Sequence, residues 1–182
     1  MSRSSRLSRA SRLTAVAALL AAAGVPVASA PAHAVGTEVV CNGSQDQKYS
    51  PGLKLVATPQ TFSETTTYDI CRPLSELGIA SGTSESTGKT PPMTCVDALR
   101  NNHVSKKITW NTGKTSTFTY DVTATHVGGQ TVVTRTGTIT SGAFAGQPAR
   151  EVITGPTPDT LKCLKGGITE RTGVATLTIF AL

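Results

Sequence analysis

Regular alternation of apolar and polar residues over residues 107–126 constrains the fold more than any other feature of the 182-residue chain. The apolar members of this alternation are Ile108, Trp110, Phe118, Tyr120 and Val122. A period of two places them on one face of a β-strand and the threonines between them on the other. Asn111 and Gly113 interrupt the pattern and supply the backbone freedom that a turn needs. The stretch predicts a hairpin whose apolar face requires a second sheet to cover it.

The first 34 residues have the pattern of a secretory signal peptide. Four arginines form a basic start, an apolar run follows over residues 13–25, and Ala32-His33-Ala34 gives the small-x-small motif of a cleavage site. A cut after Ala34 is favoured, and a cut after Ala30 stays open. The apolar run is shorter than the roughly 18 residues of a membrane-spanning helix. We therefore predict a soluble protein secreted by the Sec-type route, with residues 35–182 as one mature domain and no membrane span.

The charge of the predicted mature chain argues against a nucleic-acid partner. The whole sequence has 17 Lys and Arg against 11 Asp and Glu, a net charge of +6. Residues 1–34 hold four of the basic residues and no acid, which leaves 13 against 11, or +2. A nearly neutral chain with no basic cluster larger than Lys106-Lys107 lacks the electrostatic footprint of a nucleic-acid-binding protein.

Four cysteines predict two disulfides. An even number of cysteines is typical of an exported domain stabilised by disulfides. We favour the pairs Cys41–Cys71 and Cys95–Cys163, because an antiparallel return of the chain would bring the first two together, although three pairings are possible. A metal site is the alternative, but it lacks Cys-x-x-Cys spacing and neighbouring histidines.

The rest of the mature chain is a series of short segments rich in β-branched residues and separated by turn signals. We predict strands over residues 35–49, 65–71, 130–140, 150–154 and 174–182. A turn or strand break is expected at residues 50–53, helical turns at 73–77 and 94–102, and an exposed loop at 81–94. Thr157-Pro158-Asp159 predicts the start of a short helix, with Leu161 and Leu164 facing inward and Gly166-Gly167 at its end. Seven or more such strands favour an all-β, antiparallel, immunoglobulin-like sandwich, with a small barrel as the alternative.

Several short motifs stand in a fixed order along the mature chain between the cysteines. They are Tyr49-Ser50-Pro51-Gly52-Leu53, Trp110-x-x-Gly113-x-x-Ser116 and Gly142-x-Phe144-x-Gly146. In this order the chain resembles a group of small secreted actinomycete proteins that are β-rich and carry four cysteines. The resemblance implies an exported β-sandwich with two disulfides, and it carries over no catalytic residue.

The aromatic residues allow two interpretations. Trp110, with Phe118 and Tyr120, is expected to anchor the core against a disulfide, as a buried tryptophan does in immunoglobulin-like domains. The alternative is an exposed platform on which a sugar ring stacks, to which Tyr49 and Tyr68 would add further rings. We favour the core.

No constellation of polar residues predicts catalysis. His103 and His126 lie in polar, loop-like surroundings, and no Gly-x-Ser-x-Gly motif accompanies them. The acids available for a glycosidase pair are scattered and are expected to be solvated: Glu38, Glu64, Asp69, Asp121 and Glu151. The alternating threonines of residues 115–119 and 134–140 suit the solvent face of any sheet better than an ice-binding array, and Arg135 falls on the opposite parity. No motif for a metal or a cofactor is found.

We therefore expect a non-enzymatic, monomeric extracellular protein that binds an unidentified protein or glycan. The favoured contact region is the loop at residues 81–94, represented by Ser81, Glu85, Lys89 and Pro91. Alternatives from other classes are a small secreted hydrolase and a protease inhibitor with a disulfide-braced loop.

Overall fold

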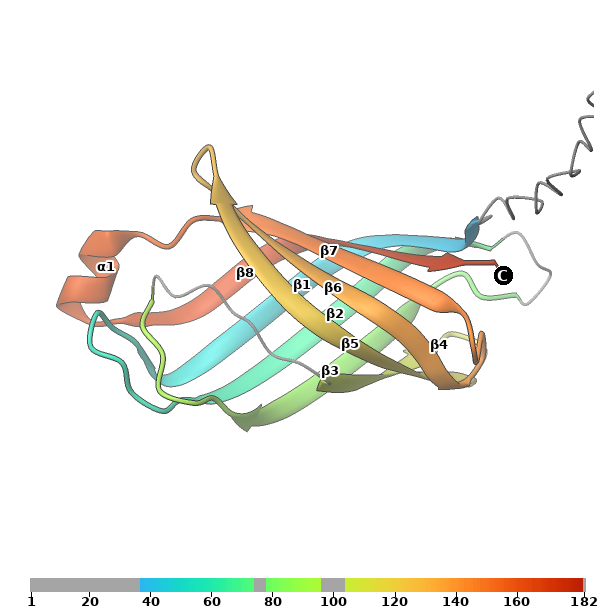
Figure 1. The fold of residues 1–182 in the computed structure, drawn as a ribbon, viewed down its shortest axis with the longest axis horizontal. Helices are drawn as coiled ribbons and strands as arrows, with labels where there is room; N and C mark the ends of the chain where they lie inside the picture. The colour runs from blue at the N-terminus through green and yellow to red at the C-terminus, as the bar shows by residue number, and fades with distance from the viewer. Residues whose placement is uncertain (1–36, 74–77, 96–103, 182) are drawn as a thin grey trace, which may run out of the picture. The chain divides into compact units, whose positions relative to one another are not determined.

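Within the residues described by the computed structural model, 37–73, 78–95 and 104–181, eight antiparallel strands close into a barrel (Figure 1). The strands are β1 Thr37–Leu53, β2 Thr61–Pro73, β3 Gly82–Lys89, β4 Val104–Trp110, β5 Thr115–Val127, β6 Gln130–Gly142, β7 Pro148–Pro156 and β8 Ile168–Phe180. A short helix, α1 Thr160–Lys165, lies between β7 and β8. Every strand pairs with its neighbours in sequence, so the chain winds once around the barrel.

Pairing of the first strand with the last closes the barrel. β1 runs antiparallel to β8, from Thr37 opposite Phe180 to Leu53 opposite Ile168. The favoured immunoglobulin-like sandwich is therefore wrong, and the small barrel that the same pattern left open is the architecture found. Inward and outward positions alternate in the same way along the strands of both folds. A closed sheet covers its own apolar face, so no second sheet is needed.

The central hairpin is present as the alternation predicts, formed by β4 and β5. Its turn is fixed by two hydrogen bonds: the Trp110 N–H donates to the Lys114 carbonyl (2.9 Å) and the Gly113 N–H donates to the Trp110 carbonyl (2.9 Å). The other predicted strands are also found, each extended by several residues. Residues 50–53, expected to break the first strand, remain part of β1. Their pairing is irregular, because the register with β2 ends at Ser50 and the register with β8 shifts between Lys48 and Leu53.

The prediction of an exposed loop at residues 81–94 is wrong over most of this segment, because Gly82–Lys89 forms β3. β3 pairs with β2 from Tyr68 opposite Gly82 to Thr61 opposite Lys89. Its small residues are required by close packing. A Cβ atom at Gly82 would lie 2.7 Å from the Trp110 ring, and one at Gly88 would lie 2.9 Å from the Phe62 ring. A sequence that reads as a flexible loop is thus a strand with rings packed against its glycines.

Helix α1 begins where the sequence predicts. Asp159 is its N-cap and accepts a hydrogen bond from the Leu161 N–H (2.9 Å), and Gly166 is its C-cap. The expected inward orientation of Leu161 and Leu164 is wrong, because Cys163 is the buried residue of this helix and both leucines are exposed. The helical turns expected at 73–77 and 94–102 fall largely outside the described residues.

Two apolar clusters fill the barrel, one near each end. The first contains Trp110 at the end of β4, Phe144 of the β6–β7 connection and the disulfide Cys41–Cys71. The second contains Leu53 at the end of β1, Ile168 at the start of β8 and the disulfide Cys95–Cys163, which ties α1 to the β3–β4 connection. We call the end with the second cluster the α1 end. The two disulfides are the pairs favoured from the sequence.

Candidate functional site

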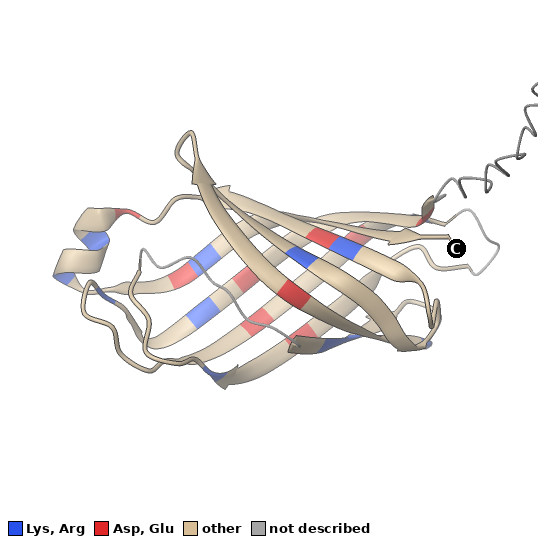
Figure 2. Ribbon diagram, viewed as in Figure 1, with Lys and Arg blue, Asp and Glu red and all other residues tan. Residues whose placement is uncertain are grey.

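A layer of charged side chains crosses the barrel interior between the two apolar clusters. We call it the charge layer, and its members are Glu64 of β2, Lys106 of β4, Arg135 of β6 and Glu151 of β7, all buried. Figure 2 shows such charged positions in the middle of the strands, away from the turns. Lys106 faces inward because it has the same parity along β4 as Ile108 and Trp110.

The charge layer is a continuous chain of ion pairs. Arg135 forms a bidentate ion pair with Glu64: Nη1 lies 2.8 Å from Oε1, and Nη2 lies 2.6 Å from Oε2. Its Nη1 also lies 2.8 Å from Oε2 of Glu151. The Lys106 ammonium lies 2.7 Å from each oxygen of Glu151, to which the Tyr68 hydroxyl also donates. Two cations and two carboxylates therefore neutralise one another without water between them.

Electrostatics keep Glu151 ionised. Burial alone would raise the pKa of Glu151, but Lys106 and Arg135 outweigh burial and hold this pKa at about 2. Burial lowers the pKa of Lys106 against the opposing effect of Glu151. The carboxylates of Glu151 and Glu64 overcome the lowering by burial and raise the pKa of Arg135 well above its ordinary value. General acid–base catalysis favours a pKa near the working pH, so we interpret this layer as structural.

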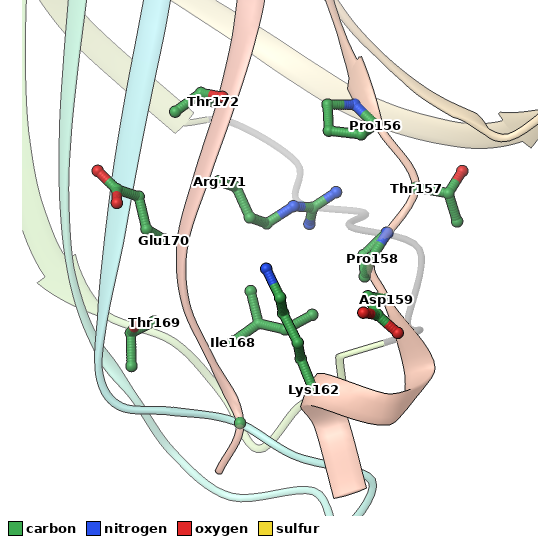
Figure 3. A pocket seen from close by; sticks show the side chains of 11 residues that line it. Pro156, Thr157, Pro158, Asp159, Lys162, Ile168, Thr169, Glu170, Arg171 and Thr172 are labelled. Carbon is green, nitrogen blue, oxygen red and sulfur yellow. The ribbon is translucent and has the colours of Figure 1, made fainter. Parts of the chain in front are cut away.

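A cavity of about 440 Å³ opens at the α1 end, outside the charge layer. It lies between the β7–α1 connection, α1 and the first half of β8 (Figure 3). Its apolar walls include Pro156, Pro158 and Ile168. Its volume is within the range of small-molecule sites, about 300–1,000 Å³.

Two cationic side chains point into this cavity from different elements. Figure 3 shows the Arg171 guanidinium and the Lys162 ammonium facing the same space, with Glu170 directed to the other side of β8. Neither cation belongs to any ion pair found among the described residues. Two carboxylates, Asp159 and Glu170, also line the cavity, and Asp159 Oδ1 accepts the capping hydrogen bond from the Leu161 N–H. The lining therefore holds two cations that face the same space and two carboxylates that are not in an ion pair with either cation.

A small chamber continues inward from the cavity toward the charge layer. It shares Pro156, Arg171 and Thr172 with the cavity, and reaches Arg135. Its volume of about 30 Å³ holds one or two waters. The amides of Gln45 and Gln47 line it together with Thr131. Two further hollows lie among the described residues: one of about 490 Å³ lined by β1, β7, β8 and the β5–β6 turn, and one of about 360 Å³ beside Trp110. Neither has a lysine or an arginine in its lining.

Tyr49 lies beside Arg171 at the rim of the interior. Burial raises the pKa of Tyr49, against the lowering effect of Arg171. The Tyr49 hydroxyl donates to Oε1 of Gln47 (2.7 Å), one of the residues that line the small chamber. Arg171 therefore lies close enough to the Tyr49 hydroxyl to oppose the effect of burial on its pKa.

The aromatic anchors expected from the sequence lie away from this site. Trp110, Phe118 and Tyr120 are all buried in the first cluster, and the Trp110 ring packs edge-on against Phe144 at 5.9 Å. The Trp110 Nε1–H donates to Ser116 Oγ (2.8 Å). A sugar platform built on Trp110, Tyr49 and Tyr68 is wrong, because none of their rings is exposed.

The other candidates do not gather into a site. Of the predicted contact loop, Glu85 and Lys89 lie on β3, and Ser81 and Pro91 lie beyond its two ends. His126 Nδ1 lies 2.9 Å from Thr131 Oγ1, whereas His103 is outside the described residues.

The expectation of solvated acids is wrong for Glu64 and Glu151, which are the two carboxylates of the charge layer. Asp69 and Asp121 are exposed. Threonine hydroxyls on the outer face bond to their neighbours, as Thr119 does with Ser105 at 2.9 Å.

Sequence reasoning missed both cations of the cavity. A signal for Arg171 exists: it has the same parity along β8 as the buried residues Ala175, Leu177 and Ile179. Lys162 carries no comparable signal, because its direction depends on how the disulfide Cys95–Cys163 orients α1. The site is therefore a product of tertiary structure more than of a motif.

Comparisons with protein-family models, with curated proteins and with solved structures found no match to this chain. Over the described ranges, no group of three or more His, Cys, Asp and Glu side chains is placed to hold a metal ion. The helix of the described region is too short and too polar to span a membrane.

Proposed function

We propose that the protein is a secreted, non-enzymatic binding protein that takes a small organic anion into the cavity at the α1 end. The observation that carries this proposal is the convergence of Lys162 and Arg171 on one cavity with no carboxylate paired to either. Two like charges that share a cavity repel each other, and an anion between them removes that repulsion. The binding energy therefore comes from charges already in place.

The chemistry of the walls narrows the ligand class. A guanidinium matches the two oxygens of a carboxylate, while an ammonium acts as a point charge. Pro156, Pro158 and Ile168 offer apolar contact to the remainder of the molecule. A compact carboxylate with an apolar body fits this combination better than a neutral or a cationic compound.

The proposal includes secretion of the protein from the cell. Two disulfides are typical of proteins that mature in an oxidising compartment, and the first 34 residues have the pattern of a signal peptide. The resemblance to secreted actinomycete proteins with four cysteines supports the same location.

Calorimetric titration with benzoate, and with benzamide as its neutral counterpart of the same shape, tests the proposal. We expect benzoate to bind and benzamide to bind at least tenfold more weakly. Replacing Arg171 with Gln should weaken benzoate binding about 10- to 100-fold, which corresponds to the loss of a charge-assisted hydrogen bond.

The matched control is Lys165→Gln, on the same helix but outside the cavity lining. Lys162→Gln should weaken binding, and Lys165→Gln should leave it within twofold of the unmodified protein. Equal binding of benzoate and benzamide, or an Arg171→Gln variant that binds as before, would contradict the proposal.

A further inference from the structure

The α1 end carries exposed aliphatic side chains on two neighbouring segments. In α1, Leu161 and Leu164 are 62% and 66% exposed, and in the β1–β2 connection Leu55 and Val56 are 45% and 73% exposed. Leu161 and Leu164 are three residues apart and share one helix face. None of the four lines the cavity at this end, so a ligand bound there would not cover them.

Several contacts hold the two segments side by side. The disulfide Cys95–Cys163 joins α1 to the β3–β4 connection, and the Cys95 N–H donates to the Lys54 carbonyl (2.9 Å). A Cβ atom at Gly167, just after α1, would lie 3.1 Å from the Lys54 side chain. Figure 1 shows α1 and the β1–β2 connection projecting together from one end of the barrel. We call residues 54–60, 90–95 and 160–167 the apolar tip.

The charged residues of the apolar tip are Lys54, Lys162 and Lys165, of which Lys162 faces the cavity. One carboxylate, the N-cap Asp159, borders the tip and is held by the Leu161 N–H. A second copy of the chain docked tip to tip would set Lys54 and Lys165 against the same lysines. The charge of the tip therefore disfavours self-association and matches a surface of negative charge.

We propose that the apolar tip docks onto an anionic phospholipid bilayer. Aliphatic side chains flanked by lysines are the composition of interfacial membrane anchors, whose apolar atoms enter the boundary between headgroups and acyl chains. Lys54 and Lys165 then lie at the level of the lipid phosphates, where each contributes about 1 kcal/mol to binding. The docking rests on the exposed leucines and the lysine charge, and it does not depend on the anion proposed for the cavity.

Co-sedimentation with vesicles tests this inference. The purified protein should sediment with vesicles of phosphatidylglycerol and phosphatidylcholine and stay in solution with phosphatidylcholine alone. Leu161→Ser combined with Leu164→Ser should weaken binding at least tenfold, and Leu55→Ser combined with Val56→Ser provides the same test on the second segment. All four side chains are exposed, so the variants should keep the melting temperature of the unmodified protein.

Control variants distinguish vesicle binding through the apolar tip from binding through apolar residues elsewhere on the surface. Val174→Ser removes a side chain on β8 that is 65% exposed, outside the tip, and should leave vesicle binding unchanged. Lys54→Gln combined with Lys165→Gln should weaken binding by about fivefold for each lysine. No binding to phosphatidylglycerol vesicles, or undiminished binding by both aliphatic pairs, would overturn the inference. A dimer in sedimentation equilibrium that the leucine pair abolishes would also overturn it.

Discussion

At the scale of single residues, the interior of the barrel depends on how Glu151 is surrounded. Its two carboxylate oxygens accept hydrogen bonds from Lys106, Arg135 and Tyr68. Arg135 also donates to Glu64. Buried ion pairs add little net stability compared with apolar packing, but an unpaired partner left behind is expensive. The charge layer therefore stabilises the fold only while each of its buried charges keeps its partner.

Removing one carboxylate should show this cost. Glu151→Gln leaves Lys106 buried without its counter-ion, and we expect the free energy of unfolding in urea to fall by about 3–5 kcal/mol. Glu85→Gln, an exposed acid on β3, should change it by less than about 0.5 kcal/mol. A fall in the free energy of unfolding of less than about 1 kcal/mol for Glu151→Gln would show that Glu151 is not buried and paired with Lys106 as described.

The three tyrosines report on the same interior through their titration. Burial raises the pKa of Tyr49, raises that of Tyr68 well above 10.0, and raises that of Tyr120 to about 12 against the lowering effect of Arg135. A raised pKa contributes stability that is fully present below the unfolded value near 10 and is lost as the pH rises toward the folded value.

Ultraviolet titration of the phenols should therefore show no tyrosine half-ionised at pH 10 while the barrel is folded. Ionisation should appear at higher pH together with loss of the folded signal. A tyrosine that titrates normally in a fully folded protein would mean that at least one ring is exposed.

Residue parity made part of the interior predictable. Lys106 has the same parity as Ile108 and Trp110, and Arg135 has the parity opposite to the threonine row, so both face inward in any sheet. Their partners were not predictable. The contact between Arg135 and Glu64 joins residues 71 positions apart, and local alternation carries no information on such distances.

At the scale of elements, β3 shows how a strand can look like a loop. Its glycines and serines have weak β propensity. They are tolerated because aromatic rings of neighbouring strands take the space that side chains would fill, as Trp110 does at Gly82. Conversely, α1 was predicted from its caps, but its rotation was not, since a disulfide fixes which residue faces inward.

Glycine replacement tests this packing. Gly82→Ala places a methyl group 2.7 Å from the Trp110 ring, and we expect it to destabilise the fold by about 1–3 kcal/mol. Gly166→Ala is the matched control, because a Cβ there meets nothing within 4 Å and the backbone φ of −149° is not in the left-handed region that favours glycine. Equal melting temperatures for the two variants would contradict the close approach of Trp110 to β3.

At the scale of the whole molecule, closure is the property that the sequence did not disclose. The all-β composition and the turns follow from local pattern, whereas pairing of β1 with β8 joins the two ends of the described chain. Closure places the charge layer and both clusters inside one sheet. It leaves the α1 end as the place where a cavity of useful size meets unpaired cations.

The most direct test of this account is chemical-shift mapping by NMR during a titration with benzoate. We predict shifts concentrated at residues 156–172, with smaller ones at Gln45, Gln47 and Thr131, and little change around Trp110 and Phe144. Shifts confined to the outer strand faces or to the end opposite α1, or no shifts at millimolar benzoate, would contradict a binding site at the α1 end.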